Sequence, residues 1–484
     1  MGQKSNPIGA IWRVTVIQCS MHRSPNARNG GKMKTFGWLI IAAVAIFVAL
    51  QAVRPTIPTR PSTAELQPPP QILLILEKDC YSCHSDQPQL SWFDQVVPAY
   101  WLVRHDILTA REHLNFSTLG SKPAAAQKAT LYEAVNMIQL GAMPLPRFTK
   151  LHPEAMVTPN ELAILKAYLA PWTNAPIQVN TVPQNATAKA ETAPAPLAAQ
   201  PELDGFPFDP SFENWKVIST TDRGDNNTFR FIVGNDIAIK AAQTGNVSPW
   251  PDGTRFAKVA WSQQLGPDGL VHPGEFVQVE LMLKDAQKYK ETDGWGWGRW
   301  RGLDLKPYGK DAHFVNECTG CHAPVRGNDY VYTLPMTVAA QIDRSEVVNN
   351  RAAALPASLP YDPLKWNAIT LYVDPKSRTT ATLYGNDTAM QAVNARGANG
   401  GPPDYQAGSV LALVTWGQRE DPHWFGARIP DIPQSVEFIH VAASGQQNSY
   451  RQFALPGLNE IQPTAGTAVL RTNFVLGMAP SRLP

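Results

Sequence analysis

Residues 295–329 read WGWGRWRGLDLKPYGKDAHFVNECTGCHAPVRGND and contain the motif C-x-x-C-H at Cys318, Cys321 and His322. Two thiols at this spacing lie about one helical turn apart, so each can form a thioether to a vinyl group of the same haem. The adjacent imidazole can then ligate the haem iron. The stretch therefore predicts a covalently attached c-type haem with His322 as the proximal ligand.

The same motif occurs a second time, far upstream, at Cys80, Cys83 and His84. Two unrelated redox dithiols or zinc-binding pairs are the alternative explanation. Neither chemistry requires a histidine directly after the second cysteine in both copies. We therefore expect two covalent c-type haems, the first with His84 as an iron ligand.

The chain is long enough for about three domains, with 484 residues, 44% of them hydrophobic and 17% charged. The 43 prolines and 33 glycines indicate long loops and linkers. A formal net charge of +2 gives no indication of a nucleic-acid partner. Four of the five cysteines belong to the haem motifs, and the fifth, Cys19, precedes an apolar segment.

That apolar segment, residues 36–53, has 18 residues without a charge and follows several basic residues. The pattern predicts a single-pass transmembrane anchor, with an extension over 1–35 left in the cytoplasm. A cleaved signal peptide is the alternative, although residues 50–52 fit a cleavage site poorly. Translation from Met33 would remove Cys19. Because this haem motif requires export, we expect both haems on the periplasmic face of the cytoplasmic membrane, or secreted to the periplasm after cleavage.

Residues 70–172, after a spacer over 54–69, predict a small all-α haem domain. Residues 72–77 form the apolar face of a helix that leads into the motif, and residues 158–172 combine an N-capping threonine with helical periodicity. The motif, the sequence HLNFS and a G-x-M-P stretch followed by LHPEA resemble the haem-binding domain family of short c-type cytochromes. The resemblance implies an electron-transfer domain.

The sixth iron ligand of the first haem is expected to be Met143, because thioether ligation raises the haem potential. A methionine before proline in a loop is also commonly a simple packing residue. Other candidates remain open: His105, His113, His152, Met137 and Met156.

The second half of the chain predicts antiparallel sheets. Residues 173–205, rich in Ala, Pro and Thr, predict a flexible linker. A haem domain over 206–350 and a haem-less copy over 351–484 follow. In the haem domain, strands are expected at 228–233, 256–261 and 276–283, and a short helix at 237–243. The predicted fold class is multi-domain α+β: a transmembrane helix, a small all-α haem domain and two related antiparallel-β-rich domains.

The stretches WKVISTTDRGDNNTFRFIVGNDIA, WPDGTRFAKVAW, VELMLKDAQKY, GWGWGRW and ECTGCH resemble the cytochrome P-460 family over about residues 206–337. In that family a lysine side chain is joined covalently to the macrocycle, and Lys258 has the matching position here. Arg230 matches a distal-pocket arginine. The resemblance also implies that the face of the haem opposite His322 is open to a small nitrogenous ligand.

These features imply an oxidoreductase that oxidises hydroxylamine or a related small nitrogen compound. Glu317, His313 and Glu280 are the candidate proton acceptors. Electrons would pass to the first haem and on to a cytochrome or another acceptor. Nitric oxide binding or sensing, as in the related cytochrome c′-beta proteins with their apolar distal cap, is an alternative, as is plain electron transfer. Of the three tryptophans at 295, 297 and 300, two are expected to fill the core rather than line the haem.

Residues 364–441 repeat the pattern of the haem domain without its haem motif. VGNDIAIKAAQTG matches YGNDTAMQAVNARG, Trp261 aligns with Trp416, and Leu413 takes the place of Lys258. An antiparallel sheet with an apolar face needs a cover. We therefore expect the copy to pack on the haem domain as an internal pseudo-dimer, in place of the second subunit of a homo-oligomer. A separate, unpaired domain is the alternative.

Overall fold

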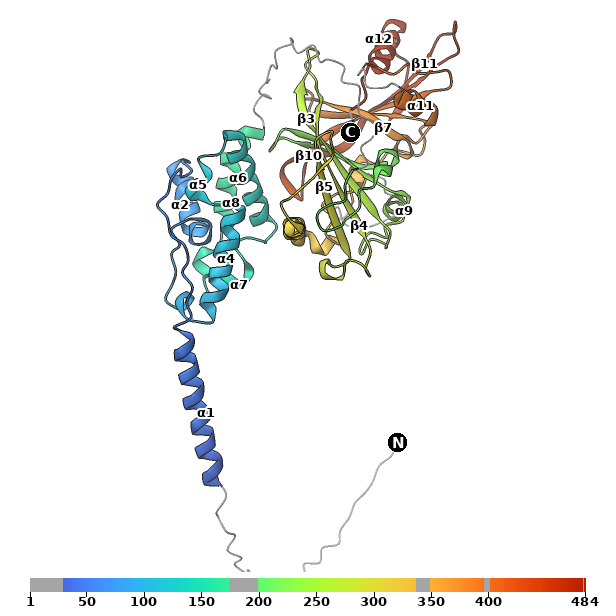
Figure 1. Cartoon of the computed structure of the whole chain (residues 1–484). Helices are drawn as coiled ribbons and strands as arrows, with labels where there is room; N and C mark the ends of the chain where they lie inside the picture. The colour runs from blue at the N-terminus through green and yellow to red at the C-terminus, as the bar shows by residue number, and fades with distance from the viewer. Residues whose placement is uncertain (1–28, 174–198, 337–348, 396–400, 482) are drawn as a thin grey trace, which may run out of the picture.

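The computed structural model describes residues 29–173, 199–336, 349–395, 401–481 and 483–484. The predicted N-terminal extension up to residue 28, with Cys19, and most of the predicted linker lie outside the described residues. Figure 1 shows a long helix, then a helical domain, then a larger β-rich region beside it. The order of helical and antiparallel β parts agrees with the predicted α+β class.

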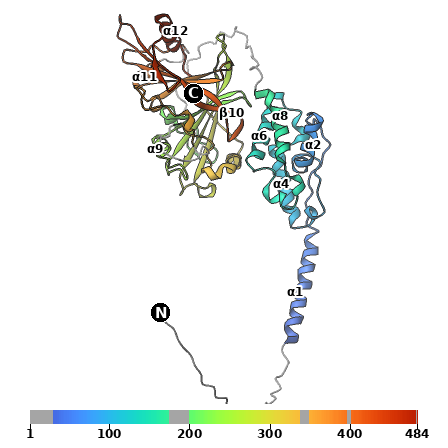
Figure 2. The ribbon, with the colours of Figure 1, turned by 180° about the vertical axis from the view of Figure 1, so that it is seen from behind.

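The long helix α1 (Asn29–Leu50) projects away from the helical domain (Figures 1 and 2). In the described part of the chain, no helix is both long enough and apolar enough to cross a membrane. The transmembrane part of the predicted fold class is therefore unsupported, and membrane attachment through residues 36–53 stays a prediction.

The helical domain packs its helices around one apolar core, which includes Leu76, Phe116, Tyr132 and Leu169. Its helices are α2 (Pro70–Asp79), α3 (Tyr81–His84), α4 (Ala99–His113), α5 (Phe116–Leu119), α6 (Ala124–Gln139), α7 (Pro146–Thr149) and α8 (Pro159–Thr173). The predicted cap of α8 is confirmed, because Thr158 Oγ1 accepts from the Glu161 N–H at 3.2 Å.

The segment before this domain is bound along α4. Trp101 Nε1 donates to the Val53 carbonyl at 2.8 Å, and Arg104 Nε donates to the Thr56 carbonyl at 3.0 Å. Side chains of α4 thus bind backbone carbonyls at the end of the predicted anchor and at the start of the predicted spacer.

The β-rich region is a closed antiparallel barrel. The ring consists of β1 (Lys216–Arg223), β2 (Thr228–Gly234), β3 (Arg255–Leu265), β4 (Val271–Lys284), β7 (Asn367–Asp374), β8 (Thr379–Gly385), β9 (Val410–Asp421) and β10 (Trp424–His440). Strand β4 pairs with β7, and β1 pairs with β10, so each repeat contributes four consecutive strands. Outside the ring lie β5 (Trp295–Arg301), β6 (Lys306–Pro307), β11 (Ser449–Ala454) and β12 (Asn459–Ile461).

The two repeats have the same local construction. Helices α9 (Asp236–Thr244) and α11 (Asp387–Ala395) each follow the second strand of their repeat. Asn235 Oδ1 accepts from the Ala238 N–H at 3.1 Å, and Asn386 Oδ1 accepts from the Ala389 N–H at 3.0 Å. These caps explain why both copies keep the sequence G-N-D.

The strand register agrees with the predicted alignment of the repeats. Lys258 lies opposite Ile232 in β2, and Leu413 lies opposite Leu383 in β8. Two strands that alternate with a period of two can share one buried face only in a fixed register. Lys258 and Leu413 therefore occupy equivalent positions in the paired strands of the two repeats.

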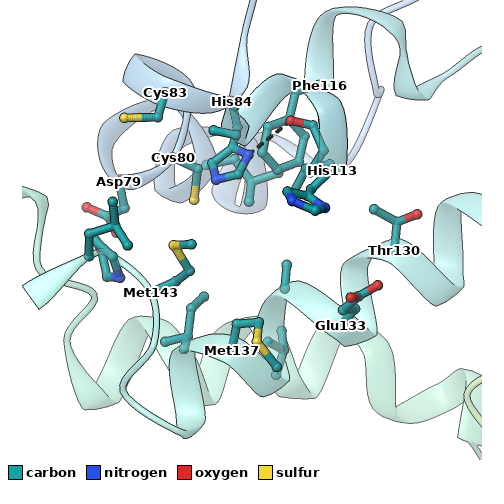
Figure 3. Close-up of a pocket in the computed structure, with 18 of the residues that line it drawn as sticks. Asp79, Cys80, Cys83, His84, His113, Phe116, Thr130, Glu133, Met137 and Met143 are labelled. Carbon is teal, nitrogen blue, oxygen red and sulfur yellow. Dashed lines mark hydrogen bonds between the residues drawn. The ribbon is translucent and has the colours of Figure 1, made fainter. Parts of the chain in front are cut away.

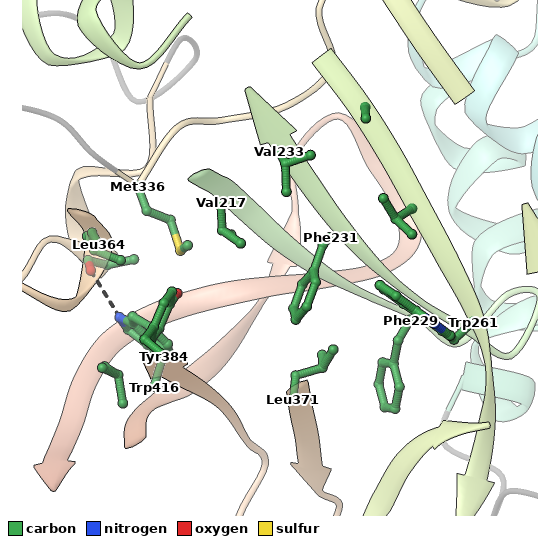
Figure 4. Packing of buried hydrophobic residues seen from close by; sticks show 14 of the residues in the cluster. Val217, Phe229, Phe231, Val233, Trp261, Met336, Leu364, Leu371, Tyr384 and Trp416 are labelled. Carbon is green, nitrogen blue, oxygen red and sulfur yellow. Dashed lines mark hydrogen bonds between the residues drawn. The ribbon is translucent and has the colours of Figure 1, made fainter. Parts of the chain in front are cut away.

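The inner faces of the two repeats form one shared core (Figure 4). Phe229, Phe231 and Trp261 of the first repeat meet Leu371, Tyr384 and Trp416 of the second in this core. Trp261 and Trp416 are both almost fully buried. The two repeats thus share one core, and the internal pseudo-dimer in place of a second subunit stays a prediction.

Candidate haem sites

The first C-x-x-C-H motif spans the junction of α2 and α3. His84 Nδ1 lies 2.9 Å from the Leu114 carbonyl oxygen. A carbonyl only accepts, so Nδ1 carries the proton and Nε2 keeps its lone pair. Burial lowers the pKa of His84, which favours the neutral imidazole that an iron requires.

A cavity of about 640 Å³ lies in front of this motif and is lined by both thiols and His84 (Figure 3). Met143 and Met137 lie on the side of the cavity away from His84 (Figure 3). Two thiols, a neutral imidazole with a free Nε2 and a largely apolar cavity suit an attached porphyrin.

The six candidates for the sixth ligand separate into two groups. Those that line the cavity are Met143, Met137, His105 and His113. His152 is instead buried beside Asp94, with 3.0 Å between its Nε2 and Oδ1 of that carboxylate. Met156 is 53% exposed and does not line the cavity. The structure thus disfavours His152 and Met156.

The second motif lies on α10 (Val315–His322), which follows β5 and β6. His322 Nδ1 lies 2.6 Å from the Tyr330 carbonyl oxygen, so this imidazole is oriented as His84 is. Burial lowers the pKa of His322 to about 4. The ring centres of Trp297 and Tyr332 lie 6.0 and 5.2 Å from that of His322.

Four charged side chains lie on the sheet face that packs against α10. We call Arg230, Lys258, Glu280 and Arg299, from β2, β3, β4 and β5, the charged row. Lys258 lies opposite Glu280, and Glu280 lies opposite Arg299. The same face carries apolar residues two or four positions along the strands, which pack with Cys318: Phe256, Trp295 and Trp297.

Ion pairs connect the members of the charged row. Lys258 Nζ pairs with Glu280 Oε2, and Arg299 Nε lies 3.2 Å from Glu280 Oε1. The side chains of Lys258, Glu280 and Arg299 are 26%, 16% and 22% exposed. Arg230 Nε is buried without a hydrogen-bond partner among the described residues. An unpaired buried donor is available for a bound group.

Burial and charge shift the pKa values in the row. Burial lowers the pKa of Lys258 to about 8, against the opposing effect of Glu280. Burial would raise the pKa of Glu280, but Lys258 and Arg299 together lower it to about 2. Burial also lowers the pKa of Arg230 to about 9. At neutral pH the carboxylate is therefore ionised, and part of the lysine is the free amine.

Of the three candidate proton acceptors, only Glu280 belongs to the charged row. Glu317 is exposed, accepts from the Tyr308 hydroxyl at 3.0 Å and lines the cavity of the first motif. His313 is also exposed, one turn before α10. Neither residue belongs to the charged row, because successive residues of a helix point about 100° apart, and a role for either as proton acceptor stays a prediction. Cys318 enters the core, and Glu317 does not.

The sequence reasoning missed Arg299 as a member of the site. Its signal was present in WGWGRWR, because residues 295, 297 and 299 of a strand share one face. All three tryptophans of this stretch are buried, and Trp300 belongs to the core between the repeats. Trp297 is the one near His322.

In the second repeat, α12 (Ala465–Leu476) and the residues after it cover the face equivalent to the charged row. The covered side chains are apolar and include Leu383, Leu413 and Ile439, which pack with Val475 and Met478. Glu437 lies opposite Leu413, as Glu280 lies opposite Lys258. Arg471 of α12 is its ion-pair partner, at 2.6 Å. In the second repeat, the face equivalent to the charged row is therefore covered by α12, whereas in the first repeat it packs against α10.

Comparison with protein-family models gives two matches in the same chain. Residues 40–171 match the haem-binding domain family, and residues 210–333 match the cytochrome P460 family. No curated protein matches the chain. The first match contains His84 and most of the residues that line the cavity, and the second contains the charged row and His322. The chain thus carries a haem-binding domain followed by a cytochrome P460 domain, and it is a haem-containing cytochrome.

Proposed function

We propose that both motifs carry a covalently attached c-type haem and that the site at His322 oxidises hydroxylamine or a related small nitrogen compound. The observation that carries this proposal is the charged row beside the second motif. A site that only binds a neutral diatomic gas has no need of an ionised carboxylate, two guanidinium groups and an amine on one face.

Each member of the row has a role in this proposal. Oxidation of hydroxylamine releases protons together with electrons, and the ionised carboxylate of Glu280 can accept those protons. The unpaired Nε of Arg230 can donate a hydrogen bond to the oxygen of the substrate. An iron porphyrin bound at His322 would supply a coordination position and accept the electrons. Arg299 keeps Glu280 ionised.

Lys258 is proposed to be linked to the macrocycle, as the resemblance to the P-460 family implies. The partly unprotonated amine supports this, because only the free amine is a nucleophile. Its equivalent in the second repeat is Leu413, which is buried under protein. The lysine is thus present in the repeat that has a haem motif and absent from the other.

Nitric oxide binding of the cytochrome c′-beta type is less well supported, because an apolar distal cap is expected there. We further propose that the first haem passes electrons to a cytochrome or another acceptor. The proposed location is the periplasmic face of the membrane, because covalent haem attachment requires export.

The test compares the full chain with Lys258→Leu, Glu280→Gln and a control, Lys240→Leu, whose lysine is exposed on α9. Mass spectrometry of the full chain should find two haems, one of which retains a peptide that contains Lys258. The lysine linkage should shift the ferrous Soret band to longer wavelength, and Lys258→Leu should abolish this shift. Glu280→Gln should reduce hydroxylamine-dependent reduction of an acceptor by about 10²-fold or more.

Lys240→Leu should match the unmodified chain in both measurements. An ordinary c-type spectrum from both haems of the unmodified chain would contradict the proposed lysine linkage. Equal turnover of hydroxylamine by the unmodified chain and Glu280→Gln would show that the Glu280 carboxylate is not the proton acceptor.

A further inference from the structure

We propose that the haem-less repeat is a docking module that holds the first haem domain against α10, so that the two haem sites share one wall and exchange electrons directly. This inference rests on the proposed function in one respect, namely that both motifs carry haem. The docking itself depends only on the contacts of the polypeptide.

Most of the contact is made by the hairpin end that joins β9 to β10, residues 421–426, which we call the docking turn. Asn136 of α6, which is fully buried, binds the backbone of this turn on both sides. The Phe425 N–H donates to Asn136 Oδ1 at 2.6 Å, and Asn136 Nδ2 donates to the Phe425 carbonyl at 3.1 Å. Two bonds to one backbone residue fix both position and orientation.

Side chains add to this contact. The Phe425 ring stacks on Tyr132 with 5.2 Å between ring centres, and Lys166 Nζ lies 5.4 Å from the Phe425 ring centre. Gln139 Nε2 donates to the Pro422 carbonyl at 3.1 Å. At Gly426, with φ +90°, an added Cβ would meet the Tyr132 ring at 2.8 Å. The turn therefore fits closely against α6.

The other side of the docking turn contacts the P460 domain next to its haem motif. His423 Nδ1 lies 2.7 Å from the Tyr332 carbonyl oxygen, and the Tyr332 hydroxyl donates to the Cys321 carbonyl at 2.6 Å. Trp424 Nε1 donates to Asp225 Oδ2 at 3.1 Å. One short turn of the second repeat thus contacts the first haem domain and reaches the second haem motif through a single tyrosine.

The result is a cavity that the first haem domain does not enclose alone. Asn316, Gly320 and Cys321 of α10 line the cavity of about 640 Å³ that contains His84. An added Cβ at Gly320 would meet nothing within 4 Å, so no side chain covers the backbone of α10 at this position. Cys321 belongs to the second motif and is followed directly by His322, so the second motif itself forms part of the wall of the cavity that contains His84.

This arrangement gives a direct route for one electron. The ferrous iron at His322 would be oxidised to ferric, and the ferric iron at His84 would be reduced to ferrous, with no other reactant. The route requires that α10 and the first cavity stay in contact. That contact depends on the docking turn.

The experiment uses the full chain and two variants of the docking turn, Phe425→Ala and Gly426→Val. Tyr361→Ala is the control, because Tyr361 is an aromatic residue of the same repeat that packs on Trp366 and Phe438. Small-angle X-ray scattering measures the separation of the domains. Flash photolysis of the half-reduced, carbon monoxide-bound protein measures electron exchange between the haems.

Both turn variants should increase the radius of gyration and slow electron exchange at least tenfold, while each haem keeps its own spectrum and Tyr361→Ala matches the unmodified chain. Unchanged scattering in both variants would overturn the docking role. Increased scattering with an unchanged exchange rate would overturn the shared-wall route. A chain with only one haem would defeat the proposed function, yet the scattering result would still decide the docking role.

Discussion

At the scale of single residues, the two histidines of the haem motifs are held in the same way but face different surroundings. His84 and His322 both donate from Nδ1 to a backbone carbonyl, which fixes the ring and leaves Nε2 for a metal. His84 opens onto a cavity with two methionines across from it. His322 lies near charged residues of a sheet. The roles that we propose, a ligated relay at the first site and a reactive second site, follow this difference.

The methionine assignment can be tested at this scale. Met143→Ala should abolish the far-red sulfur-to-iron absorption band of the oxidised protein, because the thioether that gives rise to it is removed. Met156→Ala is the matched control, because that side chain is exposed and lies outside the cavity. A band that persists in Met143→Ala and disappears in Met137→Ala would transfer the role to the other methionine of the cavity.

At the scale of elements, the same strand register gives opposite results in the two repeats. The third and fourth strands place Lys258 opposite Glu280 in the first repeat and Leu413 opposite Glu437 in the second. In the first repeat the face keeps its charges and packs against α10. In the second, α12 covers the face and supplies Arg471 as a new partner. The C-terminal helix therefore makes this face of the second repeat part of a packed core.

Because α12 buries Glu437, we expect that substitution of Arg471 strongly lowers the free energy of unfolding. Glu437 is 3% exposed, and Arg471 Nη2 donates to its Oε1 at 2.6 Å. Arg471→Met should lower the free energy of unfolding by about 3 kcal/mol, because a buried carboxylate loses its cation. Urea denaturation measures this loss. Glu437→Gln in the same chain should restore most of the stability.

The matched control is Arg451→Met, because Arg451 pairs with the exposed Glu460 at 2.8 Å. An exposed pair is worth about 1 kcal/mol or less. Equal losses from the two arginine variants would show that the Glu437 pair behaves as a surface contact and that α12 does not seal this face.

At the scale of the whole molecule, the barrel makes the two repeats a single folding unit. Strand pairs join them at both edges, and the core between them contains aromatic residues from each side. A repeat alone would expose this face to water. The copy without a haem motif therefore stabilises the repeat that carries the haem motif.

A test of this unit uses Trp416, which is fully buried and donates from Nε1 to the Ala353 carbonyl at 3.0 Å. Trp416→Ala should lower the free energy of unfolding by about 3–5 kcal/mol. Because the core is shared, the change in the Soret spectrum of the haem proposed at His322 and the change in tryptophan fluorescence should shift to the same lower denaturant concentration. Trp261→Ala should produce the same coupled shift from the other repeat.

Limited proteolysis provides an independent check of the same point. Release of residues 350–484 as a folded piece that does not rebind the remainder would contradict the single folding unit. A piece that stays associated, or that unfolds once released, agrees with it.

The sequence by itself determined the features that depend on local spacing. Two C-x-x-C-H motifs, the alternation of the strands and the capping Thr158 of α8 are each readable over a few residues. The equivalence of Lys258 and Leu413 followed from aligning the sequences of the two repeats, and the strand register gives the same equivalence. These are patterns of neighbours in the chain, so no knowledge of distant contacts was needed.

Only the tertiary structure decided which of those residues meet. It placed Arg299 in the charged row, directed Glu317 to the cavity of the other domain and brought Phe425 onto α6, 289 positions away from Asn136. It also showed α12 over the face that lacks a haem motif. Such contacts join segments far apart in sequence, and they form because each face of a sheet must be covered, by a helix or by another sheet.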